Sequence, residues 1–187
     1  CEELQNKYQN ITIVFSPEFL TQRNHLNDSI TPSRIIIGGE NKEAVKRVEE
    51  LFRHRFGNST LIYTTGWREA SLVKYGANCF FAMKISYFNF IYSICQKLEL
   101  NFNDVKDMIL SDGRISRSHA DVPGWDKQLG FGGHCFIKDI NAFIEFSKVM
   151  GLEPELLEAS WSQNQKDRSN RDWESLGSSV ISYKDKK

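Results

Sequence analysis

The chain has 187 residues, of which 40% are hydrophobic, so it is long enough for one domain or two small ones with a real core. Its 24 Lys and Arg equal its 24 Asp and Glu, so no field of one sign indicates a nucleic acid or an anionic membrane as partner. The four cysteines lack metal-type spacing and fit reduced thiols in a cytoplasm, so we expect no metal site. The sequence begins at Cys1 without a signal peptide, which indicates a processed, trimmed or incomplete polypeptide.

The first part of the chain predicts a piece of a doubly wound α/β domain. Residues 11–15, 35–37 and 61–63 are short β-branched or apolar runs, typical of buried strands. Residues 42–56 carry apolar side chains at helical spacing and predict an amphipathic helix that covers a sheet. The front half of such a domain contains a G-x-G-x-x-G turn that cradles a dinucleotide pyrophosphate, and this sequence has none. By its own sequence, the chain therefore does not build the usual cofactor site.

A carboxylate follows the first predicted strand, within Ser16-Pro17-Glu18-Phe19-Leu20. In open α/β sheets, ligands bind beyond the carboxyl ends of the strands, so Glu18 is well placed to contact one. On position alone, a solvated carboxylate in a turn or a charge at a helix N-terminus is the favoured interpretation.

The longest helical pattern runs from residue 68 to about residue 100 and would span roughly 45 Å. It is apolar on nearly every side, but charged and amide residues leave no stretch of about 18 uncharged residues, so burial in a homodimer is favoured over a membrane span. Lys74 and Asn78 are spaced i, i+4 and offer a cation and an amide to one point. On spacing alone, a snorkelling surface lysine and a helix-bonding amide are the favoured interpretation.

The glycine-rich string Gly130-Phe131-Gly132-Gly133 precedes Cys135 and lets backbone and ligand approach closely. The apolar run over residues 136–150 predicts a helix, with Phe136, Ile140, Phe143, Ile144 and residues 146–149 toward one side. Cys135 would then lie at the helix N-terminus, where the dipole and Lys138 stabilise a thiolate, with Asp139 one turn on. This pattern is typical of a nucleophile, although a single cysteine in apolar sequence is more often a small core residue.

Two further segments complete the pattern. Residues 100–109 predict a helix that leads to Asp112-Gly113-Arg114, where Arg114 is as readily a helix-end hydrogen bonder as a ligand contact. Residues 155–162 predict a short helix. The polar residues after it predict a disordered tail.

Four of these motifs resemble those of the UDP-glucose/GDP-mannose dehydrogenase family, in the family's order. Residues 130–139 are similar to its GFGGxCFxKD signature, residues 69–78 to E-A-x-L-V-K-Y-x-A-N, residues 16–20 to (S/N)PEFL and residues 112–115 to D-x-R-I. The resemblance implies an α/β part and an all-α part. The C-terminal part of a Rossmann-like domain (1–67) would be joined by the long helix to an all-helical dimerisation domain (68–164), followed by the polar tail (165–187).

The resemblance also implies an activity. It is the NAD-dependent oxidation of the 6-hydroxyl of a nucleotide-linked hexose, with UDP-glucose as the expected substrate and UDP-glucuronate as the product. Cys135 would carry a thiohemiacetal and then a thioester. Lys74 and Asn78 would bind the oxyanion, Asp139 would orient the cysteine or the water, and Glu18 would be the base.

Binding roles follow from the same motifs. Arg114 would reach the substrate of the neighbouring subunit, and the other expected substrate contacts are Phe19, Leu20, Phe131 and Gly132. Gln22 and Lys138 would lie at the cofactor. Position 22 is usually a glutamate in the family, so Gln22 keeps an acceptor oxygen and loses the charge.

A hypothesis of another class is a non-catalytic dimerisation module, or one part of a split dehydrogenase whose cofactor domain is separate. The two classes differ in what they require, because a scaffold has no need of Lys74, Asn78, Cys135 and Asp139 together. Their joint presence favours the enzyme.

Overall fold

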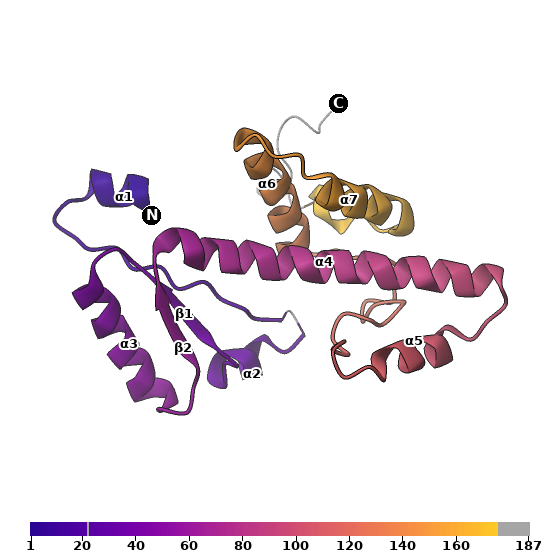
Figure 1. Ribbon diagram of the computed structural model, residues 1–187, viewed down its shortest axis with the longest axis horizontal. Helices are drawn as coiled ribbons and strands as arrows, with labels where there is room; N and C mark the ends of the chain where they lie inside the picture. The colour runs from indigo at the N-terminus through magenta and orange to yellow at the C-terminus, as the bar shows by residue number, and fades with distance from the viewer. Residues whose placement is uncertain (22, 176–187) are drawn as a thin grey trace. The chain divides into compact units, whose positions relative to one another are not determined.

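The computed structural model describes residues 1–21 and 23–175, which divide into two compact units between Gly76 and Ala77. The first is an α/β unit and the second is helical (Figure 1), which confirms the predicted fold class. The boundary lies inside the long helix α4 (Trp67–Lys97), not before it.

The first unit is built on a parallel pair of strands, β1 (Ile35–Gly38) and β2 (Ile62–Thr65). The connection between them is α3 (Lys42–Phe56), which packs on the sheet as its amphipathic pattern predicts (Figure 1). Every residue of β1 is buried, as is usual for a strand of a parallel sheet. The core consists of Ile35, Ile37 and Val45 with partly buried Val14, Val48, Phe52, Phe56 and Ile62.

The bounds of α3 follow from local chemistry. The Asn41 side chain accepts a hydrogen bond from the Ala44 amide at 3.0 Å and caps the first turn. At the other end, Gly57 takes a φ of +80°, which a β-carbon would oppose. This helix agrees with its predicted range.

The strand predicted over residues 11–15 is wrong, because only Phe15 pairs, through a single antiparallel bridge to Gly38. Side chains take the backbone groups that a strand would use. Gln5 accepts from the Ile13 amide at 2.9 Å and donates to the Ile11 carbonyl at 2.7 Å, while the Trp67 indole donates to the Ile13 carbonyl at 3.1 Å. Two short helices, α1 (Glu2–Lys7) and α2 (His25–Ile30), had no clear sequence signal.

The helical unit contains most of α4, α5 (Phe102–Leu110), α6 (Cys135–Val149), α7 (Glu155–Asp167) and the short 3-10 helix η1 (Asp172–Ser175). In Figure 1, α6 and α7 lie against one another, and their contacts agree. Two apolar clusters hold the unit together. One consists of Cys79, Ala82, Phe131, Ile137, Ile140, Ile144 and Trp173, and the other of Phe88, Cys95, Phe102, Leu110, Ala120 and Val122.

The buried face of α6 differs from the predicted one. Ile137, Ile140 and Ile144 are buried, whereas Phe146 and Val149 are exposed. The helix is turned so that Asp139 also points inward, which apolar spacing alone does not reveal.

The predicted polar tail begins too early. Helix α7 continues to Asp167, and Arg168 and Trp173 beyond it are buried. The polar side chains of this segment have internal partners, which explains its order despite its composition. The rest of that tail, residues 176–187, lies outside the described residues.

Across residues 1–21 and 23–175, no helix is both long and apolar enough to cross a membrane. The same residues contain no cluster of three or more His, Cys, Asp or Glu side chains that could hold a metal ion.

Candidate active site

Cys135 is the first residue of α6, and it is exposed, as the sequence predicts. The N-cap residue, His134, makes no side-chain capping bond, and Gly130 and Gly133 before it take φ values of +67° and +74°. Such values favour glycine, so the turn into the helix depends on these residues. The thiol therefore lies where the positive end of the helix dipole favours a thiolate.

Asp139 lies one turn into α6 and is only 1% exposed. The Asn78 side chain, from α4, donates to its Oδ2 at 2.5 Å, and Lys138 bonds its Oδ1. A buried carboxylate is tolerated when donors of this kind satisfy it. The structure thus brings together three of the predicted site residues and fixes the orientation of the Asn78 amide.

Cys79 is a second thiol near Asp139, and the sequence analysis assigned it no role. It is buried beside Asn78, and its burial raises the pKa of the thiol from an ordinary 9.0 to about 12, with the negative charge of Asp139 adding to the effect. Cys79 is therefore a neutral core thiol, in contrast to the exposed Cys135.

Lys74 and Glu18 meet in the first unit. The Lys74 ammonium is 2.6 Å from the Glu18 carbonyl oxygen and 2.9 Å from its Oε1, and it lies 5.6 Å from the centre of the Phe19 ring. The other carboxylate oxygen of Glu18 accepts from the Leu20 amide at 2.7 Å. The four predicted site residues of this region therefore form one cluster.

Phe131 is part of the protein interior, and its contact with a substrate stays a prediction. Its ring is buried against Phe136 and Trp161, and its backbone N–H and C=O both bond to Asn164. Gly132 is equally committed, since a β-carbon there would lie 2.1 Å from the Arg168 guanidinium. The glycines of the loop over residues 130–133 leave space for the side chains of Asn164 and Arg168.

Two further predicted site residues are Arg114 and Gln22. Arg114 is exposed and bonds Asp112 in its own loop with two hydrogen bonds of 2.9 and 2.6 Å, which lower the pKa of the Asp112 carboxyl. Its contact with a neighbouring subunit stays a prediction. Gln22 lies outside the described residues.

Three polar residues at the end of the helical unit were missed, namely Asn164, Arg168 and Asp172. All three bond to the glycine-rich loop or to one another. Their spacing of four residues, along a segment that continues a predicted helix, is the signal that could have indicated a shared inward face.

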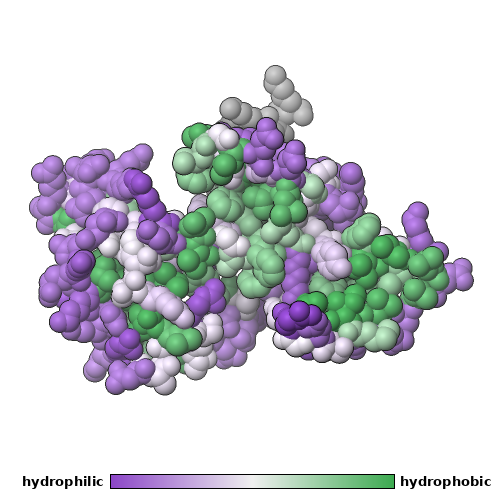
Figure 2. Space-filling model, viewed as in Figure 1, coloured by the Kyte–Doolittle hydropathy of each residue, from purple (hydrophilic) through white to green (hydrophobic). Residues whose placement is uncertain are grey.

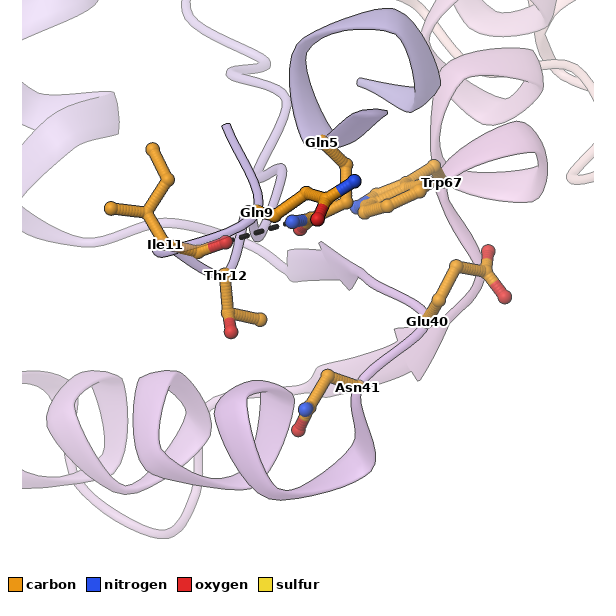
Figure 3. Close-up of a pocket in the computed structure, with 7 residues that line it drawn as sticks. All are labelled: Gln5, Gln9, Ile11, Thr12, Glu40, Asn41 and Trp67. Atoms are coloured by element: carbon orange, nitrogen blue, oxygen red, sulfur yellow. Dashed lines mark hydrogen bonds between the residues drawn. The ribbon is translucent and has the colours of Figure 1, made fainter. Parts of the chain in front are cut away.

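A polar pocket of about 320 Å³ lies elsewhere in the first unit (Figure 3). Its lining combines Glu40 and Asn41, just after β1, with Trp67 at the start of α4 and with Gln5, Gln9, Ile11 and Thr12. None of the predicted site residues lines it.

Comparison with known proteins decides the ancestry. Residues 68–166 match the central domain of the UDP-glucose/GDP-mannose dehydrogenase family, and residues 1–56 match its NAD binding domain. The chain belongs to this family. The match to the NAD binding domain supports NAD as the cofactor.

Individual relatives agree with the family assignment. UDP-glucose 6-dehydrogenase TuaD of Bacillus subtilis is 34% identical over 156 residues, covering 83% of this chain and 32% of that protein. AglM of Haloferax volcanii, also a UDP-glucose 6-dehydrogenase, is 33% identical over 82% of this chain and 35% of its own length. A UDP-glucose dehydrogenase structure from Pyrobaculum islandicum superposes with a TM-score of 0.75 at 32% identity, over 83% of this chain and 34% of that one. The chain spans about a third of the length of these relatives.

Proposed function

We propose that this chain carries the catalytic part of an NAD-dependent nucleotide-sugar 6-dehydrogenase that converts UDP-glucose to UDP-glucuronate. The observation that carries the proposal is the exposed Cys135 thiol at the start of α6, one turn before the buried Asp139–Asn78 pair. UDP-glucose is chosen because TuaD and AglM, which resemble the chain, are UDP-glucose 6-dehydrogenases.

The chain fits part of an NAD site. Its parallel strands β1 and β2 end side by side, as in a dinucleotide-binding sheet, but its sequence lacks the glycine-rich turn that cradles a pyrophosphate. When bound, NAD supplies the hydride acceptor for both oxidations. We assign no hydride step to the residues of this chain.

Cys135 supplies the covalent chemistry. Its thiolate attacks the carbon of the aldehyde-level sugar and forms a C–S bond, and the resulting oxyanion becomes the hydroxyl of a thiohemiacetal. Oxidation of this adduct leaves a thioester. The water oxygen then bonds to the thioester carbon, the C–S bond breaks, and sulfur leaves as the thiolate.

Lys74 and Asn78, one turn apart on α4, are proposed to stabilise the oxyanion. A preorganised donor of this kind typically contributes about 2.7–4 kcal/mol to the transition state. The bond to Asp139 holds the Asn78 amide in one orientation, which supports preorganisation. The ion pair with Glu18 holds the Lys74 side chain in one conformation, and this side chain is mostly buried.

The two carboxylates suit different roles. Glu18 has a half-exposed side chain, so it can take the proton from the attacking water and release it to solvent. Asp139 is sealed from water and already bonded to two donors, so we propose that it positions Asn78 and Lys138 and transfers no proton.

The test is the ratio of NADH formed to UDP-glucose consumed, measured with the whole polypeptide encoded by the gene that contains this sequence. We expect a ratio of two, because the oxidation of an alcohol to a carboxylate removes four electrons and each NAD accepts two. Cys135→Ser should abolish UDP-glucuronate, while the matched variant Cys95→Ser, at a buried thiol of the second apolar cluster, should retain the ratio. A ratio of one, or undiminished carboxylate formation by Cys135→Ser, would overturn the mechanism.

Substrate choice is tested in the same assay. UDP-glucose should give NADH at a rate well above that of GDP-mannose or UDP-N-acetylmannosamine at equal concentration. A preference for either of the others would correct the substrate and leave the cysteine chemistry in place.

We also propose that α4 mediates a homodimer. Phe80, Tyr87, Phe90 and Ile94 are exposed although they are large and apolar, and their spacing places them along one side of the helix. Figure 2 shows apolar residues gathered over the C-terminal end of α4 and α5. Sedimentation should give a dimer for the native chain and a monomer for Phe90→Glu. A native monomer at micromolar concentration would refute this assignment.

A further inference from the structure

We propose that Asn164, Arg168 and Asp172 are positioning residues for Cys135, because they fix the glycine-rich loop (residues 130–133) that leads into α6. The inference rests on the proposed role of Cys135 as the nucleophile. It assigns a function to the segment after residue 163, whose composition suggested only a polar tail.

The Asn164 side chain is hydrogen-bonded to the loop at Phe131. It is fully buried, its Oδ1 accepts from the Phe131 N–H at 2.7 Å, and its Nδ2 donates to the Phe131 C=O at 2.9 Å. One amide thus satisfies both backbone groups of a buried residue, as a neighbouring strand would. Gly130 is part of the same fit, since a β-carbon there would be 2.3 Å from the Asn164 oxygen.

Arg168 lies under Gly132. It is 3% exposed, and its Nη2 donates to Asp126 at 2.7 Å and to Asp172 at 3.1 Å, while its Nε donates to the Asn170 carbonyl at 2.9 Å. A β-carbon on Gly132 would come within 2.4 Å of three guanidinium atoms. An exposed arginine could change its rotamer to avoid such a clash. The side chain of Arg168 is buried and its hydrogen bonds fix its rotamer.

Asp172 is the third residue that bonds to the loop or to its supporting side chains. Its Oδ2 accepts from the Gly133 N–H at 2.9 Å, as well as from Arg168. From α4, the Asn89 Oδ1 accepts from the Gly130 N–H at 3.0 Å. The amides of residues 130, 131 and 133 are therefore bonded to side chains from three elements.

The loop cannot shift without breaking buried hydrogen bonds, and breaking such bonds is costly. Cys135 follows Gly133 by two residues, so the loop sets where α6 begins and where the thiol points. Catalytic groups need this kind of support, because a displacement of about 1 Å can reduce a rate by roughly 100-fold.

The experiment uses the chain's four cysteines as separate reporters of iodoacetamide labelling, followed residue by residue by mass spectrometry. Cys1 is exposed in the other unit and reports the intrinsic rate, buried Cys79 and Cys95 report loss of the fold, and Cys135 reports positioning. Arg168→Lys keeps the charge but loses the planar fork. Gly132→Ala keeps every partner and adds only the clashing β-carbon.

We expect both variants to slow Cys135 labelling by about tenfold, since the thiolate loses its place at the helix end, with Cys1 unchanged and Cys79 and Cys95 still protected. Arg171→Lys, at an exposed arginine of the same segment, and Gly113→Ala, which meets no atom within 4 Å, should match the native chain. Unchanged Cys135 labelling in Gly132→Ala overturns the proposal, as does a slowing that appears only when Cys79 and Cys95 also become labelled.

The proposed function fails by a different result. If Cys135 of the native chain reacts no faster than Cys1, the thiol is not activated. If it reacts faster and neither variant slows it, the nucleophile stands and the positioning role is wrong.

Discussion

Asp139 and Glu18 are two carboxylates that sequence motifs assign to one reaction, yet their surroundings are opposite. Asp139 is 1% exposed and bonded to Asn78 and Lys138, whereas the Glu18 side chain is 52% exposed and pairs with Lys74. Because Asp139 is buried, removing one of its hydrogen-bond partners leaves a buried polar group unsatisfied, which is costly. Water screens the pair of Glu18 and Lys74, so this pair contributes less to stability. The comparison separates a carboxylate that holds structure from one that can exchange protons.

The largest expected effect on stability is at Asp139. Asp139→Ala leaves the Asn78 amide without its acceptor and should lower the free energy of unfolding of the helical unit by about 3 kcal/mol. Urea denaturation followed by circular dichroism measures it, and Glu18→Ala is the matched variant, with a loss of at most about 1 kcal/mol. Equal losses at the two positions would remove the distinction between the carboxylates.

Cys79 sharpens the comparison through pH. Its pKa is raised from 9.0 to about 12 in the folded chain, so the unfolded chain loses its proton first as pH rises. Its contribution to stability is fully present below pH 9 and is lost between pH 9 and about 12, at up to about 1.4 kcal/mol per pH unit. The native chain should therefore lose stability more steeply than Cys79→Ala in this window. Parallel curves would contradict the burial of the thiol.

A smaller effect is expected at the exposed pair. Glu18→Gln removes the charge that faces Lys74, but the Lys74 ammonium keeps its bond to the Glu18 main-chain oxygen. The loss of stability should be below about 1 kcal/mol and should vanish in high salt. A loss that is large and independent of salt would show that this pair is sealed from water.

The smallest effect is expected at Arg114. The two hydrogen bonds from Arg114 lower the pKa of Asp112. The side chain of Arg114 is exposed and that of Asp112 is partly exposed. In Arg114→Gln the Asp112 carboxyl should titrate at higher pH by NMR, with no change in melting temperature. An unchanged titration would show that the pair does not persist in solution.

What the sequence could predict was mostly local. The bounds of α3 and the start of α6 follow from periodicity, caps and glycines within a few residues. The failed strand over residues 11–15 depends on Gln5 and Trp67, whose side chains take the backbone groups of Ile13. No local pattern contains that contact.

The candidate site shows the same limit. The sequence motifs place Cys135, Asn78 and Asp139 in one hypothesis, and the structure joins Asn78 and Asp139 by a hydrogen bond. The burial of Phe131 was not predicted, because it depends on a contact with Asn164, 33 residues away in the chain. The polar composition of the segment after residue 163 does not reveal which of its side chains are buried and hydrogen-bonded within the protein.

The measurement that tests the proposed chemistry most directly is mass spectrometry of the whole polypeptide encoded by the gene that contains this sequence, quenched with acid after incubation with UDP-glucose and NAD. We predict a nucleotide-sugar acyl adduct on the peptide that contains Cys135 and none on the peptide that contains Cys79, because Cys135 is exposed and Cys79 is buried. UDP-glucuronate formed at the full rate by Cys135→Ser, or an adduct on any other cysteine in place of Cys135, would contradict it.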